Sequence, residues 1–201
     1  MSDITSAAKA LQSHLAVTLG AAVVNKEDSP LMKAVAFGFD AGSVFASGLP
    51  KGDDFMTRYA TTIARDIYLP KLIRENPLSL CDVMTHECEH VLQYAATNVE
   101  FAWFYLTDQA ARAQFEADAY ASGIAVRCWL TGEKPEGNIP WVLESLVRAY
   151  HLRPEDKTYA EAALKSHVAS LNSGIYMTRS ARTAIDFLAQ NFPDLKGAVR
   201  A

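Results

Sequence analysis

The chain has 201 residues, half of them hydrophobic and 21% charged, which suits one globular domain and argues against a disordered chain. Its formal net charge is −4 and it has no long Lys/Arg run, so nothing indicates a nucleic-acid or membrane partner. We find no secretory signal, no transmembrane stretch and only three widely spaced cysteines, so we expect a cytoplasmic protein, or one associated with a virion.

Three patterns predict the elements of the N-terminal part. Residues 4–19 place apolar side chains at helical spacing, which predicts an amphipathic helix. Residues 31–47 place Val and Phe among glycines and an aspartate, which favours one or two strands joined by a turn at 40–43. Residues 61–69 show a period of two and end at Pro70, which is typical of a strand at a sheet edge.

Helical periodicity dominates the rest of the chain. It predicts a helix over 77–98, capped by Asn76 or Ser79, and a long Ala-rich helix over 108–131. Between them, the aromatic segment 101–106 fits a short helix or an extended link. Further helices are expected at about 140–150, 157–172 and 179–191. The whole predicts a mostly helical α+β domain with a small antiparallel sheet near its N-terminal half.

The most informative segment is His86-Glu87-Cys88-Glu89-His90, an HExxH motif inside the predicted 77–98 helix. Helical residues four apart lie about 40° apart around the axis, so His86 and His90 can bind one ion. Glu87 lies about 100° from His86, where its carboxylate can hold a water molecule and act as a general base. Two imidazoles and a carboxylate that leave one position for water suit Zn²⁺.

Other positions of this helix fit such a site. The sector beside the two histidines is apolar, which places the site at the border between core and cleft. Cys88 lies about 200° from His86, so we expect it to point into the packing. Polar residues near the ligand stripe could hydrogen-bond the ligands. They are Asp82, Gln93 and Thr97.

The motif resembles that of the gluzincin branch of HExxH metallopeptidases, whose third ligand is a Glu on a following helix. The matching stretch here is 112–120, and the resemblance makes Glu116 the third metal ligand. Many members place that Glu four residues before an Asp, a position occupied here by Gln114, which leaves Asp118 as the alternative ligand. Glu116 and Asp118 lie about 200° apart, so only one can face the ion.

The face of this helix favours Glu116. It carries the small residues Ala119 and Gly123, which would let the two helices approach closely. It also carries Arg112, which could hydrogen-bond a ligating carboxylate or form a plain ion pair with Glu116. Tyr120 shares this face as an auxiliary residue.

The resemblance covers about residues 60–130, and extends to small metallopeptidase-like proteins of bacteria and phages. It implies one zincin-like domain over 1–201, with a helical C-terminal part at 140–192. In that family the strand that matches 61–69 binds an extended peptide by strand addition. No glycine and third histidine follow His90, so the metzincin branch is excluded.

Several aromatic residues and one histidine are candidates for stabilising an oxyanion, although each is also typical of ordinary packing. They are Tyr94, Tyr120, His151 and Tyr176. A second aromatic group between the two site helices favours core packing, with a hydrophobic substrate pocket as the alternative. It comprises Phe101, Trp103, Phe104 and Tyr105.

These observations predict a zinc-dependent peptidase that acts on a protein or peptide substrate with Glu87 as the general base. The alternative is a protein in which zinc only stabilises the fold, serving as an interaction or virion-associated structural protein. A third hypothesis is a regulatory peptidase that cuts one partner. The oligomeric state has no signature in the sequence.

Overall fold

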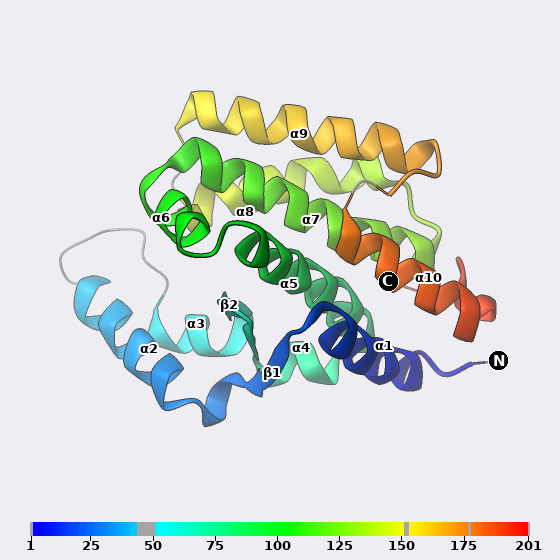
Figure 1. Ribbon diagram of the computed structural model, residues 1–201, viewed down its shortest axis with the longest axis horizontal. Helices are drawn as coiled ribbons and strands as arrows, with labels where there is room; N and C mark the ends of the chain where they lie inside the picture. Colours follow the sequence, from blue (N-terminus) through cyan, green and yellow to red (C-terminus); the bar gives the residue numbers. More distant parts are fainter. Residues whose placement is uncertain (1, 44–50, 151–152, 177, 201) are drawn as a thin grey trace.

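The computed structural model describes residues 2–43, 51–150, 153–176 and 178–200 (Figure 1). The described chain is mostly helical and contains one small sheet, which confirms the predicted α+β class in its coarse form. The longer helices are α1 (Ile4–Leu19), α2 (Pro30–Ser43), α5 (Pro77–Thr97), α7 (Gln109–Thr131), α8 (Ile139–Tyr150), α9 (Pro154–Asn172) and α10 (Arg179–Asn191). The shorter ones are α3 (Gly52–Arg58), α4 (Lys71–Glu75), α6 (Val99–Thr107) and the 3₁₀ turns η1 (Lys26–Asp28), η2 (Pro135–Asn138) and η3 (Pro193–Leu195).

The sheet has three strands in the order β1 (Ala22–Asn25), β3 (Asp66–Leu69) and β2 (Thr61–Ile63). The predicted strand over 61–69 is thus a tight hairpin, because Ala64 between its two halves adopts a positive φ of 56°. Its first half, β2, lies at the sheet edge as expected, whereas its second half, β3, is the central strand, so the edge prediction is wrong for that half. The prediction of an antiparallel sheet is wrong in part, because β1 pairs with β3 in parallel.

The strands predicted within 31–47 are absent from the described residues, where Pro30–Ser43 forms helix α2 instead. Met32 and Ala36 are buried one turn apart, and they pack with Phe55 and Tyr68 in a small apolar cluster. The same side chains therefore satisfy a helical period, and tertiary burial overrides the β-type composition. Val44 and Phe45, assigned to the same strands, lie outside the described residues.

The helices predicted in the rest of the chain are confirmed to within a few residues. Asn76 caps α5 by accepting a hydrogen bond from the backbone N–H of Ser79. Asp108 caps the start of α7 in the same manner. Gly132 ends α7 with a φ of 74°, a backbone conformation in which a residue with a side chain would be strained. The aromatic segment 101–106 belongs to helix α6.

Helices α5 and α7 run side by side through the middle of the molecule and carry the candidate site (Figure 1). The main core lies between α1, β3, α5, α10 and the C-terminal half of α7. A second core joins α7 to α8 and α9. Among the described helices, none combines the length and the apolar composition needed to cross a membrane.

Candidate metal centre

Two turns of α5 and one turn of α7 bring three side chains together. His86, His90 and Glu116 each offer a ligand atom, and these atoms lie within 4.8 Å of one another. His86 Nε2 is 3.7 Å from Glu116 Oε2, and His90 Nε2 is 3.5 Å from Glu116 Oε1. Ligand atoms of a tetrahedral zinc site with bonds of about 2.0–2.1 Å are separated by roughly 3.3 Å. The cluster could therefore hold a metal ion.

The carboxylate of Glu116 provides an independent test of this fit. The residue is only 1% exposed, and its Oε2 is buried without a hydrogen-bond partner among the described residues. A buried carboxylate oxygen without a partner is costly, whereas a cation bound by it would remove that cost. Its other oxygen, Oε1, accepts a hydrogen bond from the hydroxyl of Tyr105.

A chain of hydrogen bonds decides which nitrogen of His90 is available. Gln93 Nε2 donates to the backbone carbonyl oxygen of Phe115, at 3.0 Å, and this contact fixes the orientation of the amide. Gln93 Oε1 lies 2.8 Å from His90 Nδ1 and can only accept, so Nδ1 carries the proton. The lone pair of Nε2 therefore points at Glu116, as a metal ligand requires.

Burial also favours the metal-binding form of His86. Desolvation lowers its pKa well below the ordinary value, and the neighbouring His90 adds to this effect. The imidazole is therefore neutral near pH 7, which is the form that binds a metal. The ring of Tyr120 packs edge-on against that of His86 with centroids 4.6 Å apart, and so restricts its rotation.

Glu87 lies next to the cluster and is 6% exposed. Its Oε2 accepts a hydrogen bond of 2.6 Å from the hydroxyl of Thr62, on the edge strand β2. Burial raises the pKa of the Glu87 carboxyl, and the nearby Glu116 carboxylate adds to this effect, while the imidazole of His90, the Thr62 hydrogen bond and the ammonium of Lys26 act in the opposite direction. A carboxylate with a raised pKa is suited to accept a proton near neutral pH.

The structure distinguishes between the two acids proposed for the third ligand. Asp118 faces α9, where its Oδ1 lies 2.8 Å from His167 Nε2 and accepts a hydrogen bond from Gln114. Glu116 faces the two histidines. This arrangement follows from the angle between the two positions around the helix, and it leaves Asp118 outside the cluster.

The auxiliary residues have more varied positions. Arg112 donates to the backbone carbonyl oxygens of Tyr105 and Leu106, so it holds the end of α6. Asp82 pairs with Arg127 at 3.9 Å, and burial raises the pKa of its carboxyl to about 6. Thr97 donates to the carbonyl oxygen of Gln93 within α5.

The residues proposed to stabilise an oxyanion differ in their distance from the candidate ligands. Tyr120 lies between His86 and Trp141 and lines a cavity of about 540 Å³ bounded by α5, α7, η2 and α8. The ring of Tyr94 lies near that of Phe101, and Tyr176 packs against the main core. His151 lies outside the described residues. Tyr120 is thus the candidate that the described residues bring next to a ligand.

Three residues near the site were not assigned a role from the sequence. The sequence pattern places Tyr105 among packing aromatic residues and Thr62 in a strand. Lys26 is fully buried. Its Nζ donates one hydrogen bond to the backbone carbonyl oxygen of Tyr59, at 2.7 Å, and another to the hydroxyl oxygen of Thr61, at 2.8 Å. No local pattern marks these residues, because Tyr105 and Thr62 contact the site from other elements and Lys26 acts on Glu87 only through its charge.

Comparisons of the chain with family models, with curated proteins and with solved structures find no match in any of the three.

Proposed function

We propose that the protein is a zinc-dependent peptidase. The observation that carries this proposal is the cluster of His86, His90 and Glu116 with the Glu87 carboxylate beside it. Zinc fits this set, because two imidazole nitrogens and one carboxylate oxygen are the ligands of several catalytic zinc sites, which keep a fourth position for water or substrate. Magnesium and calcium prefer sites made only of oxygen ligands.

Three residues of the chain have separate roles in the proposed hydrolysis. Bound zinc supplies polarisation of the scissile carbonyl and activation of water. Glu87 accepts the proton of the attacking water and transfers it to the leaving amine. Thr62 holds the Glu87 carboxylate in place through its 2.6 Å hydrogen bond. Tyr120, beside His86, is the candidate donor to the developing oxyanion.

The edge strand favours a peptide as the substrate. Within the described residues β2 pairs only with β3, so its other edge can pair with an extended chain. Thr62 joins this strand directly to Glu87, and a peptide added to β2 would therefore run past the candidate base.

The direct test combines metal analysis with turnover. The purified protein should bind one zinc ion per chain and cleave a mixture of fluorescence-quenched peptides, and a chelator should abolish cleavage. Glu87→Gln should retain zinc and lose at least about 100-fold in rate, because a general base contributes that much or more. Glu100→Gln, on the exposed side of α6, is the matched control and should be unaffected. Failure to bind zinc, or full activity of Glu87→Gln, would contradict the proposal.

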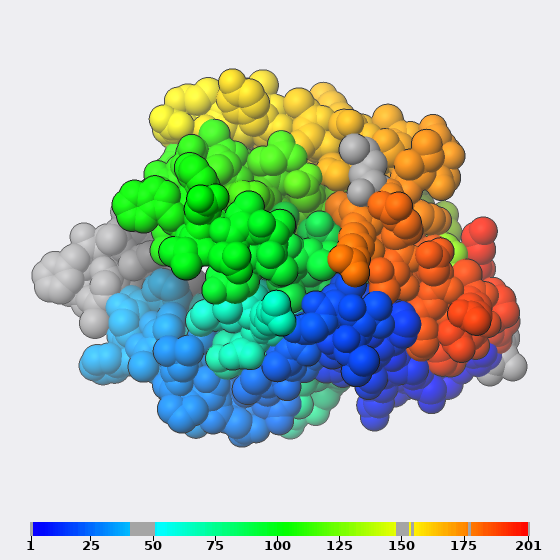
Figure 2. All heavy atoms as spheres, in the orientation of Figure 1, coloured from blue at the N-terminus to red at the C-terminus, as the bar shows by residue number. Residues whose placement is uncertain are grey.

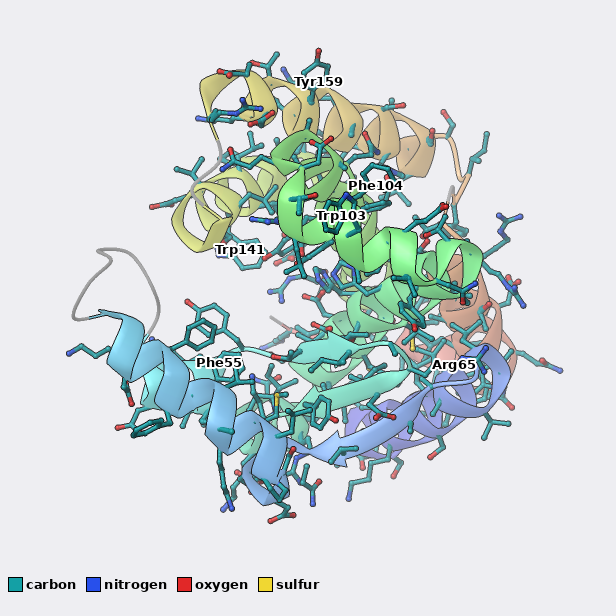
Figure 3. The ribbon with its side chains drawn as sticks, turned by 60° about the vertical axis from the view of Figure 1, so that its left-hand side comes forward. Phe55, Arg65, Trp103, Phe104, Trp141 and Tyr159 are labelled. Carbon is teal, nitrogen blue, oxygen red and sulfur yellow. The ribbon has the colours of Figure 1, made fainter. Side chains whose placement is uncertain are left out.

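The alternative is a structural zinc site in an interaction or virion-associated protein. The observation that favours it is the surface of α6, on which Val99 is 75% exposed, Trp103 65% and Leu106 72%. The green side chains of this helix lie at the molecular surface in Figure 2, and Figure 3 labels Trp103 among them. Exposed apolar side chains gathered on one helix are typical of a contact surface. Under this alternative, zinc raises the melting temperature but the loaded protein cleaves none of the peptides.

A further inference from the structure

The carboxylate of Glu116 is held unequally at its two oxygens. Oε1 accepts a hydrogen bond from the Tyr105 hydroxyl, while Oε2 has no hydrogen-bond partner among the described residues. Both oxygens are within 3.7 Å of an imidazole Nε2, so either one, or both, could in principle meet an ion. The hydrogen bond from Tyr105 distinguishes the two oxygens of Glu116, because only Oε1 accepts it.

Tyr105 is itself held on three sides. Its ring packs edge-on against that of His90 with centroids 5.9 Å apart, and it lies tilted by 39° against the ring of Phe101 with centroids 5.5 Å apart. Arg112 donates to its backbone carbonyl oxygen and to that of Leu106, which ties the last turn of α6 to α7. The guanidinium lies 5.5 Å from the Tyr105 ring centroid. These contacts on the ring and on the backbone direct the hydroxyl at Glu116.

From this geometry we infer that Tyr105 is a positioning residue that restricts Glu116 to binding the metal through one oxygen, Oε2. A carboxylate can bind a metal through one oxygen or two, and the second mode would use the position that a catalytic site keeps for water or substrate. A hydrogen bond to Oε1 stabilises the one-oxygen mode, because Oε1 remains engaged with the hydroxyl. The inference rests on the metal site of the proposed function.

Tyr105→Phe removes the hydroxyl and keeps the ring against His90 and Phe101. Loss of an outer hydrogen bond to a metal ligand typically costs 10–100-fold in metal affinity. We therefore expect the Kd for zinc, measured by competition with a chromophoric chelator, to rise by about that factor. The Co²⁺-substituted variant should also absorb more weakly in the visible range than wild type, because a carboxylate bound through two oxygens raises the coordination number above four.

The matched control is Tyr94→Phe, whose ring lies near Phe101 with centroids 6.5 Å apart. Its zinc affinity and Co²⁺ spectrum should match those of wild type. In a Glu116→Ala background, adding Tyr105→Phe should change the zinc affinity no further, because the hydroxyl acts through that carboxylate. Far-UV circular dichroism of each variant shows whether the fold is retained.

The outcomes separate this inference from the proposed function. If wild type binds zinc and Tyr105→Phe has the same Kd and the same Co²⁺ spectrum, the role of Tyr105 is overturned while the metal site stands. A further loss of affinity in the Glu116→Ala background would also overturn it, because the hydroxyl would then act by another route. If wild type itself binds no zinc, the metal site fails and the inference fails with it.

Discussion

The imidazole of His90 is oriented by Gln93, and the amide of Gln93 is oriented in turn by the backbone carbonyl oxygen of Phe115. This short chain joins the two site helices one residue before the third candidate ligand. It leaves only one nitrogen of His90 able to bind a metal. At the scale of single residues, such contacts convert a sequence motif into a site with defined ligand atoms.

The role of Gln93 is testable by two substitutions. Gln93→Leu removes both hydrogen bonds and should weaken zinc binding by about 10–100-fold. Gln93→Glu keeps an acceptor for His90 Nδ1–H but loses the donor to Phe115, so its affinity should lie closer to that of wild type. Chelator competition measures both values. Equal affinities of Gln93→Leu and wild type would contradict the assignment.

Lys26 predicts a dependence of stability on pH. It is fully buried, its Nζ lies 3.4 Å from the Phe55 ring centroid, and burial lowers its pKa from 10.5 to about 8. Between about pH 8 and 10.5 the unfolded chain binds more protons at this residue than the folded protein does. The free energy of unfolding therefore rises with pH in that window, by at most about 1.4 kcal/mol per pH unit.

Urea unfolding at pH 7.5, 8.5 and 9.5 checks this sign. Lys26→Met lacks the titrating group, so the stability of wild type relative to the variant should increase as the pH rises. Taking the difference between the two proteins removes contributions from the buried thiols of Cys81 and Cys88, whose raised pKa values act in the opposite direction. A difference that is constant or falls with pH would refute the prediction.

At the scale of elements, the close approach of α5 and α7 places Glu116 against the two histidines. Gly123 and Asp82 mark the contact, because a Cβ at Gly123 would overlap the Asp82 carboxylate and lie 3.0 Å from the Asp82 backbone oxygen. The fully buried Ala119 lies one turn earlier on α7. Small residues on this face thus allow the distances measured in the cluster.

Gly123→Ala should therefore separate the two helices slightly. We expect a loss of about 1–3 kcal/mol in the free energy of unfolding, typical of overpacking, together with weaker zinc binding. Denaturant unfolding and chelator competition measure the two effects. Gly137→Ala is the control, because a Cβ there meets no atom within 4 Å. If Gly123→Ala is as stable as wild type, the contact between α5 and α7 can accommodate a Cβ at this position, and the prediction is wrong.

At the scale of the whole molecule, the candidate site joins parts of the chain that fold around different cores. α5 belongs to the main core, whereas the turn of α7 with Ala113 and Ala117 belongs to the second core, with α8 and α9. An ion held by both helices would connect the two cores. Its binding should therefore stabilise the entire described fold, not only the site.

Thermal unfolding tests this coupling. At a free zinc concentration 100 times the Kd, the free energy of unfolding should rise by about 2.7 kcal/mol, and a chelator should reverse the increase. His90→Ala should unfold at the same temperature with zinc or with chelator. A wild-type melting temperature that does not respond to zinc would rule out a bound ion that connects the helices.

The sequence alone determined the parts of this protein that depend on local chemistry. The HExxH spacing placed two histidines and a glutamate on one helix, and Asn76, which caps that helix, was one of the two residues expected to do so. The angle between Glu116 and Asp118 required that only one of them face the ion, and the small residues on the Glu116 face favoured the acid that the structure brings to the cluster. These features follow from the 3.6-residue period, which acts over one or two turns.

Only the tertiary structure decided the rest, because the deciding contacts join residues far apart in the chain. The segment 31–47 has a β-like composition, yet its described part is a helix that buries Met32 against Phe55 and Tyr68. The parallel pairing of β1 with β3 joins residues about 44 positions apart. Thr62 reaches Glu87 from the hairpin, and the Tyr105 hydroxyl selects one oxygen of Glu116. Such choices depend on three-dimensional proximity, which local periodicity does not encode.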